Sequence, residues 1–165
     1  MEPRDLATLL EANLGRQLYW IGSADSKAVF GFALNTAMLG FLAAVAPKSA
    51  TNWTIAPAVF ASFAAALGLV SLLFLSFAAF PRTKGPKGSL IYCDGVSQRS
   101  ADQFKQAILS LATEAYVEDL ASQCHRNAEI ASKKFAWVQR ALLCLYISVP
   151  PWALALWLLY SAPNL

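Results

Sequence analysis

The sequence predicts an all-α membrane protein with three transmembrane helices, long cytosolic helical extensions and a small helical cytosolic insertion. Hydrophobic residues make up 57% of the chain and charged residues only 14%, whereas soluble domains carry about 25% charged residues. Three apolar segments are each long enough to cross a hydrocarbon core of about 30 Å. Between them, apolar residues recur at the three- and four-residue spacing of amphipathic helices.

The first 27 residues are expected to form a cytosolic amphipathic helix that continues into the first span, residues 28–46. No proline interrupts the chain between Pro3 and Pro47, so one helix of about 40 residues, roughly 60 Å long, is predicted. A signal peptide is not expected, because the polar lead is too long and too acidic. The apolar stripe of the lead consists of Leu6, Leu9, Leu10, Leu14, Leu18 and Ile21.

The second and third spans are predicted at residues 55–80 and 141–162. The sequence PKSATN before the second span indicates an external turn. Pro150 and Pro151 interrupt the third span, and each removes a backbone donor from the helix. We therefore expect a kink there, which serves either as a hinge or as a fixed bend.

Residues 81–140 form a predicted cytosolic sensor region. The stretch SLIYCDGVS contains an Asp-Gly turn signal and favours a small hairpin. SADQ at residues 100–103 fits a capping box that opens a helix through about Leu111. A second helix begins near Thr113 and reaches the third span without a breaker. Because this region is too small to bury a core alone, it must dock against the lead helix or oligomerise.

Basic residues predict the orientation of the chain in the membrane. The lead and residues 81–140 together hold twelve of the thirteen Lys and Arg residues. By the positive-inside rule these parts are cytoplasmic, so the N-terminus lies inside and the C-terminus outside.

Composition and motifs exclude several function classes. A net charge of +3 gives no reason to expect a nucleic-acid partner. The three cysteines show no paired spacing, which favours reduced thiols. His125 follows Cys124 but has no second ligand pair at metal spacing. We find no catalytic Ser/His/Asp set and no phosphate-binding glycine loop, so neither an enzyme nor a bound cofactor or metal is expected.

Three stretches of the chain resemble a known family in the same order. NLGRQLYWIGSADSKAVFGFALNTAMLGFLA resembles the opening of the transmembrane effectors of bacterial Pycsar anti-phage defence. LATEAYVEDLASQCHRNAEIASKKFAWVQRALL resembles their closing cytosolic helix. LIYCDGVS stands at the position of a short segment in which those proteins carry Phe where this chain has Cys93.

The resemblance implies a partner cyclase that makes cyclic UMP or cyclic CMP during infection. The effector would sense that cyclic pyrimidine nucleotide as its activating ligand and damage the lipid of the bacterial inner membrane, which separates cytoplasm from periplasm, to cause abortive infection. The small size of the cytosolic part separately favours a homo-oligomer. Two other classes stay open: a ligand-independent oligomeric holin-like or structural membrane protein, and a small transporter accessory subunit. The cytosolic insertion of roughly 60 residues is longer than a simple holin needs.

One row of polar residues is the first candidate for ligand binding. Gln123, Asn127, Ile130 and Lys134 recur at helical spacing beside the apolar stripe. Two amides and an ammonium are suited to a pyrimidine edge and a cyclic phosphate. The alternative interpretation is that they form hydrogen bonds between helices and fix the packing.

Charged residues near the membrane are the second group of candidates. Asp25 either contributes to the site by pairing with Lys134 or Lys27, or is an ordinary interfacial charge. Arg82 and Arg99 are candidates for contacts to the phosphate. Together with Lys84 and Lys87, they alternatively set the topology and contact anionic lipid.

The predicted orientation is tested by labelling single cysteines from outside intact cells, in a background without the native thiols. A cysteine at Ser49 should react with an impermeant maleimide, and one at Ser100 should be protected because it lies inside. Labelling of Ser100→Cys as strong as that of Ser49→Cys would overturn the assignment.

Overall fold

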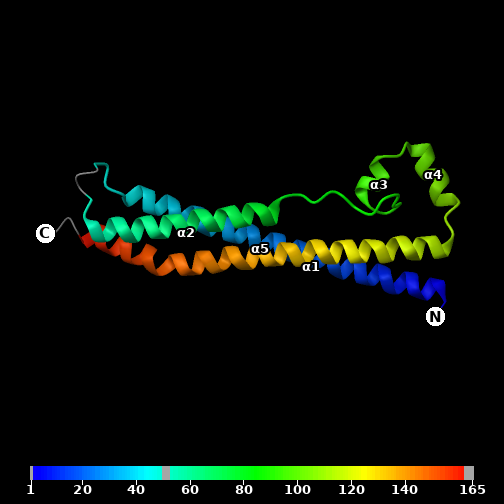
Figure 1. Ribbon diagram of the computed structural model, residues 1–165, viewed down its shortest axis with the longest axis horizontal. Coiled ribbons are helices and arrows are strands. Elements are labelled where there is room, and N and C mark those ends of the chain that lie inside the picture. The colour runs from blue at the N-terminus through cyan, green and yellow to red at the C-terminus, as the bar shows by residue number, and fades with distance from the viewer. Residues whose placement is uncertain (1, 50–52, 162–165) are drawn as a thin grey trace. The chain divides into compact units, whose positions relative to one another are not determined.

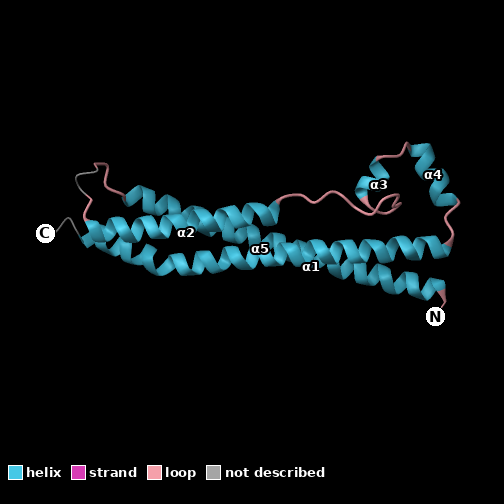
Figure 2. Ribbon diagram, in the orientation of Figure 1, coloured by secondary structure: helices cyan, strands magenta, loops and turns pink. Residues whose placement is uncertain are grey.

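The computed structural model describes residues 2–49 and 53–161 and shows an all-α protein (Figure 1). No strand occurs among the described residues (Figure 2), which confirms the predicted fold class. The helices are α1 (Pro3–Val45), α2 (Ile55–Ala79), α3 (Cys93–Ser97), α4 (Ala101–Leu109) and α5 (Thr113–Ser161).

The long helices follow the predicted segments closely. α1 is one continuous helix of 43 residues, and α2 ends one residue before the predicted end of the second span. α5 remains helical through Pro150 and Pro151 as far as Ser161, so the prolines do not interrupt it. Residues 50–52 of the predicted external turn, and the chain from residue 162, lie outside the described residues.

The predicted hairpin at SLIYCDGVS was wrong, because the chain turns there and forms the short helix α3. The Ser89 hydroxyl accepts hydrogen bonds from the amides of Ile91 (3.1 Å) and Tyr92 (2.9 Å). Such local bonds occupy the donors that a strand ladder would need. The capping box was correct: Ser100 and Gln103 exchange hydrogen bonds at the start of α4, which ends at Leu109 instead of Leu111.

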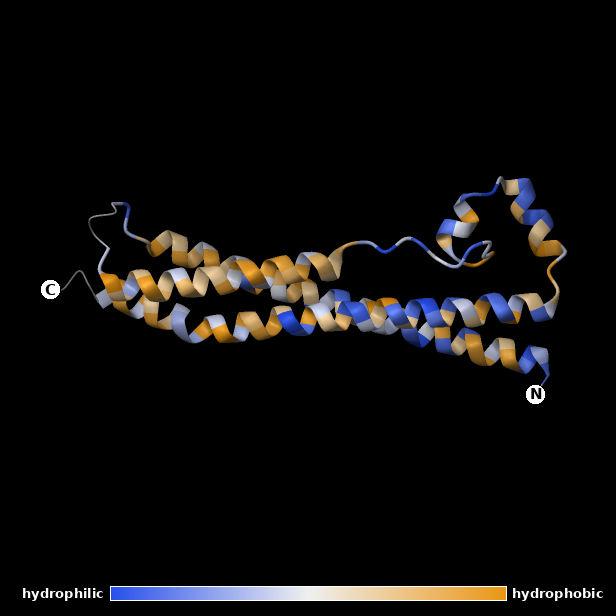
Figure 3. Ribbon diagram, in the orientation of Figure 1, coloured by the Kyte–Doolittle hydropathy of each residue, from blue (hydrophilic) through white to orange (hydrophobic). Residues whose placement is uncertain are grey.

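The chain divides into two compact units. The first unit comprises residues 1–24 and 80–134, and the second comprises residues 25–79 and 135–165. α1 and α5 contribute to both, whereas α2 belongs to the second unit alone. In Figure 3, α2 is apolar along nearly its whole length, whereas the first halves of α1 and α5 alternate between polar and apolar residues.

A regular row of small residues forms the buried face of α2. The spacing along this row alternates between four and three residues, which is the heptad spacing of supercoiled helices. Small side chains let helix backbones approach closely within a membrane. The row consists of Pro57, Ala61, Ala64, Gly68, Ser71, Leu75 and Ala78.

The same spacing continues on the other two helices of the second unit. On α1, the buried row runs through Ala28, Gly31, Asn35, Met38 and Leu42. On α5, it runs through Val138, Ala141, Leu145 and Ser148. We call these rows of alternating spacing the buried seams of the helices.

Two apolar clusters hold the second unit together. Leu75, fully buried, packs with Ala28 and Ala141 in one of them. Beside it, the Trp137 ring of α5 lies 5.6 Å from Phe74 and 5.2 Å from Phe77. The second cluster forms around Leu42, Ala61 and Ala155. Each cluster therefore joins all three helices.

Three side chains of the second unit donate hydrogen bonds across helices among the described residues. Asn35 Nδ2 donates to the Gly68 carbonyl at 2.9 Å, and the Ser71 hydroxyl donates to the Ala141 carbonyl at 2.8 Å. Trp152 Nε1 donates to the Met38 carbonyl at 2.9 Å. Unpaired polar groups are costly in an apolar environment, so these bonds fix the register of the seams.

Three helices, α1, α2 and α5, are long and apolar enough to cross a membrane. Within their most apolar windows only 22–28% of residues are buried in the chain itself. The remaining apolar surface requires lipid or another protein to cover it. The chain is therefore a membrane protein.

Replacing Asn35 with alanine should lower the free energy of unfolding by about 1 kcal/mol, because an interhelical hydrogen bond is lost. Thr36, the exposed neighbour on the same helix, provides the matched control. Denaturant titration of the detergent-solubilised Asn35→Ala and Thr36→Ala variants measures the difference. Equal stabilities would show that the bond to Gly68 contributes nothing.

Candidate ligand cavity in the first unit

Polar contacts join α1 to α5 in the first unit. The Tyr116 hydroxyl donates to Glu11 Oε1 at 2.7 Å, and the bond raises the pKa of Tyr116 to about 12. The Cys124 thiol donates to the Leu10 carbonyl at 3.4 Å, and burial raises the pKa of this thiol. This last pair is separated by 114 positions, as are Trp152 and Met38 in the second unit. The two helices therefore run parallel in the same register in each unit.

The chain between α2 and α4 is anchored on α5 through Ser89. The Ser89 hydroxyl donates to Asp119 Oδ2 at 3.1 Å and accepts from Gln123 Nε2 at 2.6 Å. Asp119 also accepts the amide of Leu90 at 2.8 Å. Ser89 is itself buried, so these bonds determine where the following residues lie.

Arg99 holds the same segment from the other side. Its guanidinium donates to the carbonyls of Gly88 (2.7 Å) and Ser89 (2.9 Å), and also to that of Gly95. A Cβ atom at Gly95 would lie 2.3 Å from the Ser89 carbonyl oxygen, so only glycine allows this close approach. Arg99 is thus occupied by three backbone carbonyls.

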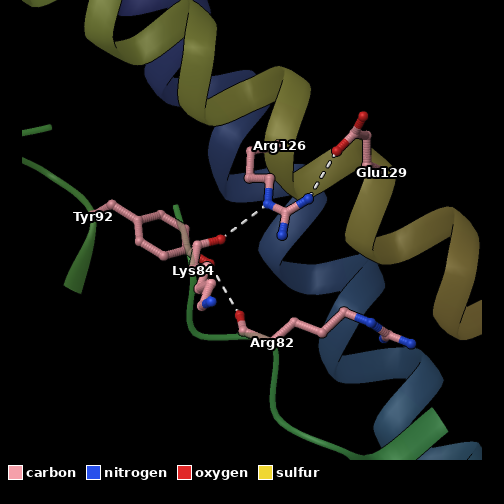
Figure 4. A network of polar contacts seen from close by, with 5 residues as sticks. All are labelled: Arg82, Lys84, Tyr92, Arg126 and Glu129. Atoms are coloured by element: carbon pink, nitrogen blue, oxygen red, sulfur yellow. Dashed lines mark hydrogen bonds and ion pairs between the residues drawn. The ribbon is translucent and has the colours of Figure 1, made fainter. Parts of the chain in front are cut away.

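A second polar network fixes the segment nearer to α2 (Figure 4). The Tyr92 hydroxyl donates to the Arg82 carbonyl at 3.1 Å. Arg126 of α5 donates to the Lys84 carbonyl at 3.0 Å and pairs with Glu129 at 2.9 Å. Hydrogen bonding to Arg126 lowers the pKa of Glu129. The Arg82 side chain points away from the Arg126–Glu129 pair (Figure 4).

These contacts enclose a cavity of about 440 Å³ between α1, α5 and the anchored segment. This volume lies within the range of small-molecule sites, about 300–1,000 Å³. Among the described residues that line it, two are basic and none is acidic, which favours an anionic ligand. The lining consists of Leu14, Leu18, Ile21, Arg82, Thr83, Ile91, Tyr92, Cys93, Gln123, Asn127, Ile130 and Lys134.

Polar side chains in this cavity are unusually buried. The exposed fraction is 2% for Gln123, 6% for Asn127 and 8% for Lys134. Gln123 bonds Ser89, as the packing interpretation expects. Asn127, by contrast, shows no side-chain hydrogen bond to the described part of the chain. The Asn127 amide therefore keeps access to the space of the cavity, where a ligand can hydrogen-bond to it.

Four of the six residues predicted to bind a ligand line this one cavity: Arg82, Gln123, Asn127 and Lys134. The other two do not line it. Arg99 lies behind the wall, bonded to backbone carbonyls. Asp25 belongs to the second unit, where it is half-buried.

Three residues of interest, Tyr92, Cys93 and Gln17, are not predicted as site residues from the sequence. Tyr92 and Cys93 line the cavity because the chain turns at Ser89. The predicted hairpin would not have placed these two side chains in a cavity wall. Gln17 of α1 is 5% exposed, and its Oε1 atom has no hydrogen-bond partner among the described residues. Gln17 lies three residues after Leu14 and four before Ile21, which is the seam spacing, and this spacing could have predicted its burial.

Replacing Arg99 with glutamine should loosen the wall of the cavity, because three carbonyls lose their shared donor. We expect at least tenfold faster hydrogen exchange of the amides of residues 89–96, measured by mass spectrometry. Lys105→Gln, an exposed change on α4, is the matched control. Similar exchange in both variants would mean that Arg99 does not hold the segment.

Comparison with known proteins identifies the family. A family model described as the Pycsar effector protein domain matches residues 9–161, nearly the whole chain and both of its units. No curated protein and no solved structure matches the chain. The three membrane-spanning helices agree with the match. The chain therefore belongs to the Pycsar effector family, the transmembrane effectors of Pycsar anti-phage defence.

Proposed function

We propose that the chain binds cyclic UMP or cyclic CMP in the cavity of the first unit and, when bound, disrupts the inner membrane to cause abortive infection. A partner cyclase supplies the nucleotide during infection. The N-terminus and residues 81–140 face the cytoplasm, and the C-terminus faces the periplasm. The proposal rests on membership of the Pycsar effector family and on the chemistry of the cavity.

The observation that carries the proposal is a contrast between polar residues of the two units. In the second unit, Asn35 and Ser71 donate to backbone carbonyls of neighbouring helices. In the first unit, Asn127 has no such partner in the described chain, and neither has the Gln17 carbonyl oxygen. A polar side chain that lines a cavity and makes no hydrogen bond within the protein is available to bind a ligand, which is the situation of Asn127.

The lining residues match the parts of a cyclic pyrimidine nucleotide. The cyclic phosphate carries a negative charge, and Arg82 and Lys134 supply the two cations of the cavity. Asn127 can both donate to and accept from the edge of a pyrimidine base. The Tyr92 ring offers a surface for stacking. The cavity volume of about 440 Å³ is sufficient for a cyclic mononucleotide.

Binding can reach the membrane through α1 and α5, because each of these helices belongs to both units. A ligand shifts a conformational equilibrium only by its different affinity for the two states. The nucleotide must therefore favour one packing of α1 against α5. In a homo-oligomer, that packing sets which surfaces of the spans meet lipid and which meet another copy.

Cyclic UMP or cyclic CMP should raise the melting temperature of the detergent-solubilised protein. At a ligand concentration of a hundred times the Kd, binding adds about 2.7 kcal/mol to the free energy of unfolding. Lys134→Ala should weaken binding at least tenfold, since hydrogen bonds to charged groups contribute about 1.5–3 kcal/mol. Asn127→Ala should weaken it roughly fivefold, since a neutral hydrogen bond to the base contributes about 1 kcal/mol. Lys133→Ala, exposed beside Lys134, should bind as the parent does. Cyclic AMP and cyclic GMP should give smaller shifts.

The same variants are then expressed with an active cyclase, and membrane potential is followed with a voltage-sensitive dye. Asn127→Ala should delay depolarisation, and Lys133→Ala should not. Depolarisation without any cyclase, undiminished in every variant, would favour the ligand-independent holin-like alternative. A melt that no cyclic nucleotide changes at millimolar concentration would contradict the sensor.

A further inference from the structure

A groove of about 470 Å³ lies on the second unit, between α1 and α5. Lys27 and Gln139 are the polar residues of its lining, and the remainder is mostly apolar, with Val138, Leu142 and Leu143. Its lining on α5 extends from Phe135 to Tyr146, roughly 16 Å along a helix axis. That length corresponds to about half of a hydrocarbon core, which is one leaflet.

Lys27, the charged residue of the groove, lies where the first apolar span begins. Lys27 directly precedes the first span, and Arg140 directly precedes the apolar segment of α5. Lys27 Nζ sits 5.5 Å from the centroid of the Phe135 ring. The Arg140 guanidinium sits 4.8 Å from the Trp137 ring. Both cations are therefore held over aromatic rings at the membrane boundary, where Lys and Arg meet lipid headgroups.

The balance of charge in the second unit favours an anionic occupant. Its sequence contains three basic residues and one acidic residue, Asp25. The Lys27 side chain is exposed, so a headgroup can reach it. Asp25 already interacts within the chain.

We propose that this groove binds one anionic phospholipid of the cytoplasmic leaflet, with an acyl chain along Val138, Leu142 and Leu143 and the phosphate at Lys27. A second copy of the chain is a poorer occupant. A two-fold contact through this face would bring Lys27 of one copy near Lys27 of the other. Like charges at such a contact repel, whereas a phosphate and an ammonium attract each other.

The test compares phosphatidylglycerol with phosphatidylcholine, each added to the full-length protein in neutral detergent, with the thermal melt as the readout. Phosphatidylglycerol should stabilise the parent protein at lower concentration. Lys27→Gln should reduce this preference about fivefold, since a basic residue near the surface contributes about 1 kcal/mol. Lys27→Arg keeps the charge and should keep the preference, which separates loss of charge from misfolding.

Lys48→Gln is the matched control, because Lys48 is also exposed and basic in the second unit but does not line the groove. It should leave the lipid preference unchanged. Equal losses in Lys27→Gln and Lys48→Gln would reduce the effect to general surface charge and overturn the site. Efficient disulfide formation between copies carrying Leu143→Cys, undiminished by phosphatidylglycerol, would show that another copy occupies the groove.

Discussion

Close packing along the buried seams is the constraint on which this molecule depends. α2 buries a residue every three or four positions, and five of those seven are alanine, glycine or serine. In lipid there is little hydrophobic force between helices, so stability comes from backbones that approach closely and from hydrogen bonds across them. Gly68 illustrates this, since a Cβ there would lie 3.0 Å from Asn35 Oδ1. The bond from Asn35 to the Gly68 carbonyl requires that closeness.

The same seam serves two purposes along α1 and α5. At Asn35 its polar side chain donates to a backbone carbonyl of α2 and joins the spans, and at Ala141 its backbone carbonyl accepts from Ser71 of α2. Further toward the N-terminus of each helix, Gln17, Asn127 and Lys134 occupy equivalent spacing beside or within a cavity wall. The shape of a site at seam positions depends on helix packing, because any change in the distance between α1 and α5 moves the walls of the cavity.

Periodic features of this fold could be predicted from sequence, and non-periodic ones could not. The stripe on α1 and the row from Gln123 to Lys134 are helical repeats. The helices α1 and α5, and the wall of the cavity that α5 supplies, could therefore be predicted from them. The segment around Ser89 has no repeat; one hydroxyl with four partners determines its path. The sequence predicts Arg99 as a phosphate contact, whereas its guanidinium donates to three backbone carbonyls, because sequence does not reveal which cations a backbone turn will use.

Lys134 in the first unit is buried, whereas Lys27 in the second unit is exposed. The two ammonium groups are therefore suited to different anions, a soluble nucleotide and a lipid phosphate. A buried ammonium has lost most of its hydration, so its charge acts strongly on a ligand small enough to enter the cavity. An exposed ammonium at the bilayer boundary is screened by salt and is suited to a mobile lipid present in excess. A soluble nucleotide would therefore bind selectively at low concentration. The lipid composition would determine the packing of the spans on which nucleotide binding then acts.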